Sequence, residues 1–337
     1  MAANPSNPHD AYFRNVLGRP AEAASELRLV LPKEIVARLD WSTLEVQSGT
    51  FVSDELRSRQ SDLLFRTRLD GRDAFVYILL EHQSRSDNLM PFRMLEYVVN
   101  IWNHYLRSQP DARLLPPIIP VVVHVGPNGY RWTAPMDVVD LIDADADVRA
   151  ALGEYLPRLR YVLDDVNAVD LPALLRRPLT PAAKVMLCLQ KIVSGNPDLV
   201  TQLLLLRPEL RAIIAGPGGK QAFRAIVKYI LFVGDIDADD LDPLTDQLGT
   251  EAKEVIVTTA DKLRAEGEAR GEARGEARGE ARGEARGRAA ALIELLTLKF
   301  GRLPASVEQV IRDGGLEQLK VWTARVLTAS SLDDVLA

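Results

Sequence analysis

The sequence predicts an α/β protein: a helix, a three-stranded antiparallel meander, a second helix and a further strand, followed by an all-α region. Three observations predict this order. Asp70-Gly71, a hairpin signal, separates two apolar runs. Apolar residues then recur at helical spacing over 91–107, and a β-branched run follows at 118–123. Beyond residue 146 the apolar spacing is helical, so we expect no further strand there.

The composition is that of a globular protein and bounds the class of function. The chain has 337 residues, 47% hydrophobic and 26% charged, with a net charge of -6, enough for two or three domains. This net charge argues against DNA binding through the whole surface, but a metal-dependent nuclease needs only local positive charge. The lone Cys188 excludes an internal disulfide and a multi-cysteine zinc site.

The expected location is cytoplasmic, with no membrane partner. A single cysteine fits a reducing compartment. The first residues lack the basic and then apolar pattern of a secretion signal. The purest apolar stretch, 118–125, is far too short to span a bilayer.

The first predicted domain covers residues 1–145. A helix is expected to begin at Asp10 as its N-cap, a second to cover 21–31 after Pro20, and a short third to cover 32–39. The pattern over 44–52 is extended. The hairpin, the helix over 91–107 and the strand at 118–123 complete the domain.

Three further regions are predicted after residue 145. Residues 146–263 read as four to six packed helices. Residues 264–288 repeat Gly-Glu-Ala-Arg with period 4, which costs ~1 kcal/mol per glycine and places like charges at i,i+4. We therefore expect a frayed helix or flexible spacer; the alternative is that its small residues let helices approach closely in a homo-oligomer. Residues 289–337 are expected to form a small helical domain that needs a partner or a neighbouring segment to bury its apolar faces.

The stretch 77–83, Tyr-Ile-Leu-Leu-Glu-His-Gln, carries the predicted chemistry. If Gly71 and Arg72 form the hairpin tip, Asp62 lies directly across from Glu81, with the two Cβ atoms ~5 Å apart. Two carboxylates this close repel each other unless a cation lies between them. The pattern thus indicates a Mg²⁺ site, with other divalent ions as alternatives. The plainer interpretation is that both acids end strands at the solvent edge.

Each residue near this pair has an expected role in phosphodiester hydrolysis. Asp62 and Glu81 would hold the ion, with a backbone carbonyl near His82 completing the protein ligands, and one metal-bound water would be the nucleophile. Gln83 falls on the face of Glu81 and would orient water or contact the phosphate. A neutral amide cannot neutralise developing charge, so a nearby cation is expected to contact the phosphate. The candidates are Arg66, Arg85 and Arg93.

Two other patterns are weaker. The aspartates at 235, 237, 239 and 246 are spaced like a calcium loop, but Asp240 stands where glycine is needed, so an acidic turn between helices suffices. His124 ends the predicted strand near the sheet edge. A role in the site is open for it, but the sequence gives no support.

Several motifs together resemble a known family. They are His9-Asp10 with Phe13, Ser61-Asp62-Leu63-Leu64, Leu80-Glu81-His82-Gln83-Ser84, Met90-Pro91-Phe92-Arg93, and Ile119-Pro120-Val121-Val122-Val123-His124-Val125-Gly126. Over roughly residues 8 to 250 the chain resembles the Rpn family of YhgA-like recombination-promoting nucleases, also described as transposases. This family lies within the PD-(D/E)xK nuclease superfamily, whose core has the predicted order of elements.

The resemblance implies metal-dependent DNA endonuclease activity that promotes recombination independently of RecA. Asp62 and Glu81 match the metal-binding acids, and Gln83 stands where many superfamily members have lysine. A further acid on the first helix is common in the superfamily; Glu26 and Asp10 are candidates, although Asp10 is also explained as a helix cap. The alternative is a non-catalytic assembly or regulatory module that retains the nuclease fold and oligomerises through its C-terminal tail.

Overall fold

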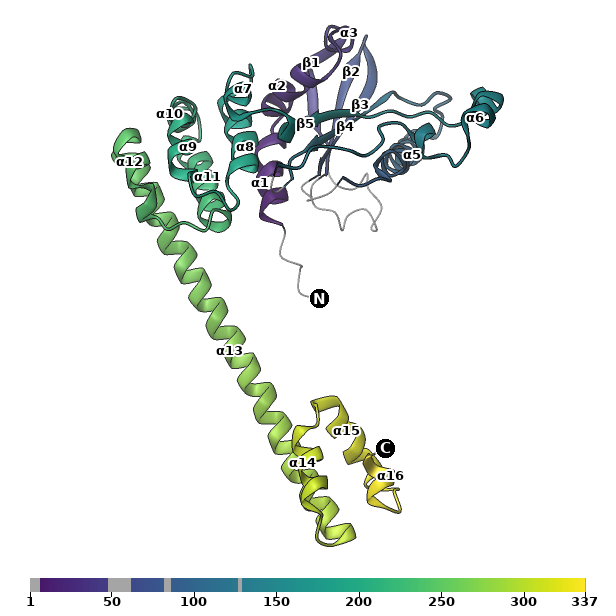
Figure 1. Ribbon diagram of the computed structural model, residues 1–337, viewed down its shortest axis with the longest axis vertical. Helices are drawn as coiled ribbons and strands as arrows, with labels where there is room; N and C mark the ends of the chain where they lie inside the picture. The colour runs from purple at the N-terminus through teal and green to yellow at the C-terminus, as the bar shows by residue number, and fades with distance from the viewer. Residues whose placement is uncertain (1–6, 48–61, 82–85, 127–128, 337) are drawn as a thin grey trace. The chain divides into compact units, whose positions relative to one another are not determined.

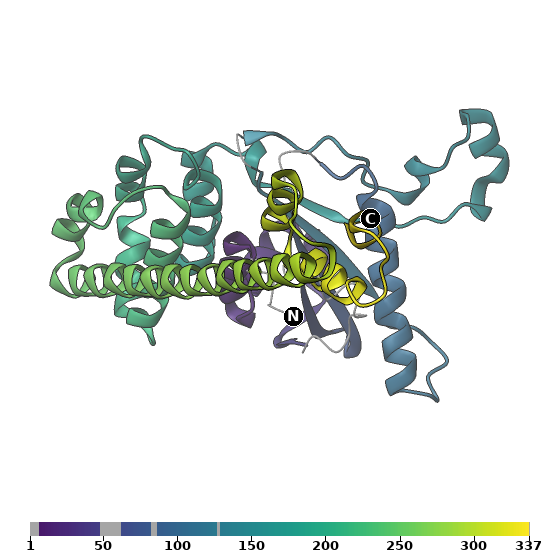
Figure 2. The ribbon, with the colours of Figure 1, turned by 90° about the horizontal axis from the view of Figure 1, so that it is seen from below.

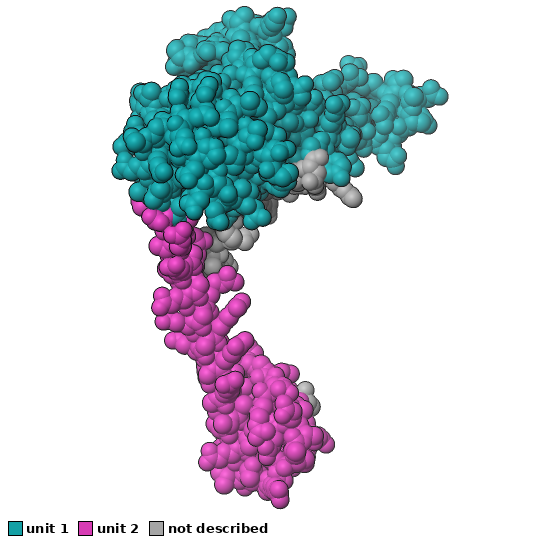
Figure 3. All heavy atoms as spheres, turned by 60° about the vertical axis from the view of Figure 1, so that its left-hand side comes forward, with its two compact units in different colours: residues 1–260 teal, residues 261–337 magenta. Residues whose placement is uncertain are grey.

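The computed structural model describes residues 7–47, 62–81, 86–126 and 129–336, with the side chains of residues 80 and 81 left out. It divides the chain into two compact units, residues 1–260 and 261–337 (Figure 3). The first unit contains both the predicted domain 1–145 and nearly all of the predicted helical domain 146–263. These two regions share one hydrophobic core, so the structure joins what the sequence pattern divided.

The first unit is built on a five-stranded mixed sheet in the order β1-β2-β3-β4-β5. The first three strands pair antiparallel, and β4 and β5 continue in parallel with β3. The strands are β1 (Leu39–Val46), β2 (Asp62–Leu69), β3 (Arg72–Glu81), β4 (Ile118–His124) and β5 (Val162–Asp165). Since β2 is antiparallel to the strands that follow it, its first residue lies at the edge where β3, β4 and β5 end.

Two helical layers cover opposite faces of the sheet (Figures 1 and 2). Val76, Ile78, Val121 and Val123 point to one layer, which contains α1 (Pro8–Leu17), α2 (Pro20–Val30) and α8 (Pro181–Ile192). The alternate strand residues, such as Leu79 and Val122, point to α5 (Met90–Ser108). This period-2 alternation gives a strand two buried faces and gives each face its own core.

The remaining elements of the first unit are helices that extend the first layer or connect the sheet. They are α3 (Lys33–Val36), η3 (Val138–Leu141), α6 (Ala146–Leu152), η4 (Gly153–Tyr155), η5 (Val166–Ala168), α7 (Leu171–Leu175), α9 (Leu199–Leu205), α10 (Arg207–Ala215), α11 (Gly219–Val233), η6 (Asp239–Leu241) and α12 (Asp242–Leu248). The first helix begins at Pro8 with Asn7 as its N-cap, so the prediction of Asp10 as the cap is wrong; Asp10 lies in the first turn.

The strand β5 contradicts the all-α prediction for residues beyond 146. It has only four residues, and its pairing with β4 rather than a long apolar alternation makes it a strand. The predicted helices at 21–31 and 91–107 are confirmed by α2 and α5. Part of the predicted extended segment 44–52 falls in β1, and residues 48–52 lie outside the described residues.

The second unit contains most of α13 (Thr250–Phe300), which is one unbroken α-helix through the Gly-Glu-Ala-Arg repeat. This differs from the expected frayed or flexible spacer. Residues 266–284 are exposed, and the end of the helix packs in a small core with α14 (Ala305–Asp313), α15 (Leu316–Arg325) and α16 (Leu332–Leu336). This core buries Leu292, Leu296 and Trp322. Among the described residues, every helix is either too short or too polar to span a bilayer.

Candidate functional site

The β2–β3 hairpin sets the geometry of the predicted acidic pair. Leu69 pairs with Arg72, so Asp70 and Gly71 form the tip, and Asp62 lies opposite Leu79. Both tip residues have positive φ, 49° and 78°, as a two-residue type I′ turn requires. The predicted tip at Gly71 and Arg72 is therefore wrong by one residue, and the predicted pairing of Asp62 with Glu81 is wrong by two, because aspartate adopts positive φ more readily than arginine.

The corrected register keeps Asp62 on the face it was predicted to share with Glu81. A shift of two residues preserves the alternation of faces, whereas a shift of one would reverse it. Positions 62 and 81 become diagonal neighbours, for which Cα atoms are roughly 7–8 Å apart. The backbone of Glu81 is described as the last residue of β3, but its side chain is not, and His82, Gln83 and Arg85 lie outside the described residues.

Asp62 is half-buried as a residue, yet both of its carboxylate oxygens are shielded from solvent. It lies on the face covered by α5, beside the buried phenol of Tyr77. Burial, and then the charge of Asp62, raise the pKa of Tyr77 well above its usual value. The ring of Tyr97 from α5 packs 4.8 Å from the ring of Tyr77, centroid to centroid. A shielded carboxylate in such a place requires a cation or hydrogen-bond donors to remain charged.

Two residues that the sequence did not assign to the site continue the line of Glu81 across the sheet. Position 81 pairs with His124 on β4, and His124 pairs with Asp165 on β5. In adjacent paired positions the side chains lie on the same face of the sheet. Positions 81, 124 and 165 thus form a row across the sheet. This row is two residues along β3 from Leu79, the residue that pairs with Asp62. The sequence gives little sign of β5, because this strand has only four residues and its last two are acids, Asp164 and Asp165.

His124 is 1% exposed and is oriented by the loop that follows β4. Its Nε2 lies 3.0 Å from the carbonyl oxygen of Tyr130, so Nε2–H donates, and its ring packs 5.0 Å from that of Trp132. This leaves Nδ1 as an acceptor; it is buried and has no hydrogen-bond partner among the described residues.

Asp165 is held by the same loop. Its Oδ2 accepts a hydrogen bond of 2.9 Å from the backbone N–H of Trp132. Its Oδ1 is buried and has no hydrogen-bond partner in the part of the chain that the structure describes. Each of two neighbouring side chains in the row therefore keeps one buried acceptor atom that no described donor reaches.

The two candidates for an additional helix acid lie elsewhere. Glu26 on α2 is fully buried in the layer of α1, α2 and α8, where its neighbour is Asp164. Asp164 pairs with Val123, so this cluster is on the opposite face of the sheet from Asp62. Asp10 is on α1 in the same layer, and burial raises its pKa. Neither acid is brought to Asp62.

The two described arginine candidates already bind acids. Arg66 donates to Asp73 at 2.8 Å and lies four residues along β2 from Asp62, a rise of ~13 Å. Arg93 on α5 donates to Asp87 at 2.6 Å. Of these two, Arg93 is on the helix that covers the face of Asp62. Within the described residues, no group of three or more His, Cys, Asp or Glu side chains is placed to hold a metal ion.

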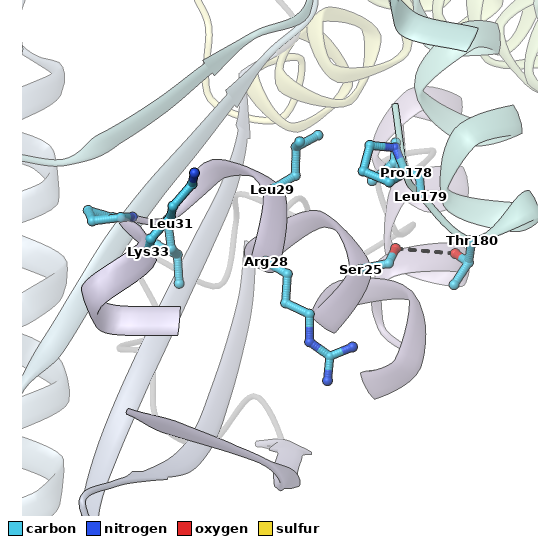
Figure 4. Close-up of a pocket in the computed structure, with 9 residues that line it drawn as sticks. Ser25, Arg28, Leu29, Leu31, Lys33, Pro178, Leu179 and Thr180 are labelled. Carbon is cyan, nitrogen blue, oxygen red and sulfur yellow. Dashed lines mark hydrogen bonds between the residues drawn. The ribbon is translucent and has the colours of Figure 1, made fainter. Parts of the chain in front are cut away.

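A cavity of about 690 Å³ lies away from this edge, between the C-terminal half of α2 and residues 178–180 (Figure 4). Its lining includes Arg28, Lys33 and Leu179, and the hydroxyls of Ser25 and Thr180 meet at 3.3 Å beside it. None of the predicted site residues that the structure describes lines this cavity.

Comparison with known proteins identifies the family. The model of the family described as "Putative transposase, YhgA-like" matches residues 7–215, which is more than half of the chain. The chain therefore belongs to this family of YhgA-like proteins. The match includes the whole sheet and the Asp62 edge, so the site described above lies within the family's shared region.

The relatives are named for nuclease and recombination functions. Recombination-promoting nuclease RpnA of Escherichia coli K12 is 27% identical over 271 residues, 78% of this chain and 85% of the relative. RpnD of Escherichia coli O157:H7 is 26% identical over 263 residues, 77% of this chain and 94% of the relative. RpnE of Escherichia coli K12, named an inactive recombination-promoting nuclease-like protein, is 26% identical over 137 residues, 39% and 45% of the two chains. No solved structure matches the chain.

Proposed function

We propose that this chain is a Mg²⁺-dependent DNA endonuclease with a PD-(D/E)xK-type core, which acts in DNA recombination in the cytoplasm. The observation that carries the proposal is the position of Asp62. Its shielded carboxylate lies at the sheet edge where β3 ends with Glu81, in a chain whose relatives are named recombination-promoting nucleases. The diagonal relation of positions 62 and 81 gives two carboxylates room to converge on one small cation, which binds oxygen at about 2.0–2.1 Å.

The donor chemistry at this edge fits a hard divalent cation. Carboxylate oxygens from Asp62 and Glu81, with a backbone carbonyl near His82, are the ligands that Mg²⁺ prefers. When bound, the ion would lower the pKa of a coordinated water and stabilise charge on the scissile phosphate. Gln83, two residues after Glu81, would orient that water through its amide. Arg93 and Arg85, close in sequence to this edge, would bind the substrate phosphate.

Other described side chains would position this site. The Tyr77 phenol beside Asp62 restricts the carboxylate, and α5 excludes solvent from it. The buried Nδ1 of His124 and Oδ1 of Asp165 lie in the row that contains Glu81, where each could accept a hydrogen bond from an ordered water or the amide of Gln83. Catalysis at this edge would then rest mainly on positioning and charge.

The test compares cleavage of supercoiled plasmid by the wild-type protein and by Asp62→Asn, with Mg²⁺ and with EDTA. We expect Asp62→Asn to lower the cleavage rate at least ~100-fold, because an amide is a poor ligand for a hard cation. Asp73→Asn is the matched control, since it makes the same change on the same hairpin at an exposed ion pair. Equal cleavage by wild type and Asp62→Asn would reject the proposed site.

A second function has support in one observation: a relative over part of this chain is named inactive. In that case the fold would serve as an assembly or regulatory module, and the second unit would form a homo-oligomer. Absence of Mg²⁺-dependent cleavage by the folded wild-type protein, together with a tail-dependent oligomer, would favour this function.

A further inference from the structure

A groove between α1 and α11 gathers positive charge in a protein whose net charge is -6. It has a volume of about 400 Å³ and lies between the C-terminal end of α1 and the N-terminal half of α11, two helices that pack against each other. The polar residues that line it are Asn15, Arg19, Gln221, Arg224 and Lys228. It contains three cations and two neutral amides, and no acid among the residues that the structure describes lines it. We call it the α1–α11 groove.

The cations of this groove are largely free of acidic partners. Arg224 and Lys228 are exposed and make no ion pair with any residue that the structure describes. Arg19 reaches Glu22 only at 4.0 Å. By contrast, Lys220 on the same helix lies 3.4 Å from Glu251 and is not among the residues that line the groove. The α1–α11 groove therefore presents positive charge that is not neutralised by close ion pairs with the described acids.

The backbone places these side chains on one line. Gln221, Arg224 and Lys228 recur at i, i+3 and i+7, so they lie on one face of α11. The turn before α11 is fixed by packing: a Cβ at Gly219 would meet the carbonyl oxygen of Ile214 at 2.1 Å, and Gly218 has φ of 68°. Arg224 and Lys228 are separated by a rise of about 6 Å, over which one DNA strand presents about two phosphates.

We propose that the α1–α11 groove binds the phosphate backbone of duplex DNA, outside the edge that carries Asp62. The inference rests on the proposed function for its choice of DNA, and on charge complementarity for the surface. Fixed cations without acidic partners attract a polyanion by releasing its counterions, without reading base sequence. A groove of this kind would hold the substrate while the sheet edge that carries Asp62 acts on it.

The experiment measures binding rather than cleavage. Fluorescence anisotropy with a 30-base-pair duplex, in EDTA and at several salt concentrations, compares the full-length wild type with the double variant Arg224→Gln/Lys228→Gln. We expect roughly tenfold weaker binding, and a slope of log K against log[salt] that is shallower by about 2 because two phosphate contacts are lost. The control is Lys220→Gln/Lys253→Gln, which changes the net charge equally at two exposed, acid-paired lysines.

Each outcome decides the proposal. Unchanged affinity and slope in Arg224→Gln/Lys228→Gln would overturn it, even if Asp62-dependent cleavage is found, so the two hypotheses fail separately. Equal weakening by the control would show a general charge effect and also overturn it. The same measurement with an RNA duplex of the same sequence separates the two nucleic acids. If the double variant loses affinity only for the RNA duplex, the groove binds RNA and the proposal for DNA is wrong. Thermal unfolding of both variants checks that the four exposed substitutions leave the fold intact.

Discussion

Glu26 on α2 and Asp164 on β5 are neighbouring buried carboxyl groups that lie beside one guanidinium, that of Arg177. Glu26 is 0% and Asp164 5% exposed. Arg177 donates to both oxygens of Asp164, at 2.7 and 2.8 Å. Burial, and then the charge of Asp164, raise the pKa of Glu26 well above its usual value. Glu26 therefore keeps its proton at pH values where it would ionise in the unfolded chain. The Arg177 guanidinium then pairs with one carboxylate, that of Asp164.

This relationship predicts how stability depends on pH. The folded pKa of Glu26 lies above its unfolded value, which is near 4.5. The contribution of Glu26 to the free energy of unfolding is therefore fully present below the unfolded pKa and is lost as the pH rises through the folded pKa. Glu26→Gln removes this titration and keeps a neutral group of similar shape. From pH 5 to pH 8, we expect its free energy of unfolding in urea to rise relative to wild type. Glu34→Gln, at an exposed position on α3, should leave the difference constant.

The hairpin shows how far the sequence could predict the site. The Asp-Gly signal correctly located the turn, and the predicted pairing put Asp62 on the same face of the sheet as position 81, which the observed register retains. It could not fix the tip to one residue pair, because register depends on which residues accept positive φ at both turn positions. The error of two residues preserved the face but changed a direct pair into a diagonal one.

Long-range pairing explains what the sequence missed. The strand β5 has four residues, too few for an alternation to be distinguished from a helix segment. Its contacts with β4 bring Asp165 next to His124, some 40 residues away in the chain. The same short strand places Asp164 against Glu26, so Glu26 lies on the opposite face of the sheet from the proposed metal site. No local pattern carries this information.

The phenol of Tyr77 offers a test of the Asp62 environment. Tyr77→Phe removes one buried hydroxyl beside the carboxylate and leaves the packing against Tyr97 in place. We expect Mg²⁺-dependent cleavage to fall roughly tenfold, with a loss of about 1 kcal/mol in stability. Rates measured over a range of Mg²⁺ concentrations would show whether metal affinity changes. Tyr155→Phe, at an 84% exposed position, is the control; equal effects from both substitutions would contradict the assignment.

Two amide substitutions separate the roles of the two ring nitrogens of His124. Gln at this position can keep a donor near Nε2 for the carbonyl of Tyr130 but has no acceptor at the Nδ1 position, whereas Asn has its amide near Nδ1. If Nδ1 serves the proposed site, cleavage should be lower in His124→Gln than in His124→Asn, although His124→Gln should be the more stable of the two. Plasmid cleavage and thermal unfolding measure these orders. The same order in both assays would mean that His124 has only a structural role.

Removal of the second unit should leave the first intact. The cores of the first unit end at Ile256, and the small core of the second begins at Ala289. A chain that ends at residue 263 should keep the secondary structure of the sheet and its helices, and any Asp62-dependent cleavage. Circular dichroism, plasmid cleavage and gel filtration measure these three properties. Loss of a larger species on gel filtration would show that the tail assembles the protein; loss of cleavage would show that the tail serves the site.

The glycines of the repeat distinguish a solvated helix from an assembly surface. An added Cβ at Gly271, Gly275 or Gly279 would meet nothing within 4 Å. In a solvated helix, each Gly→Ala substitution should stabilise α13 by about 1 kcal/mol. The triple variant of the full-length protein should therefore keep more helical circular dichroism on heating. If the glycines instead let helices of two copies approach closely, the same substitutions would push the helices apart, and sedimentation would show a weaker oligomer. The sign of the effect thus decides between the two functions proposed for this segment.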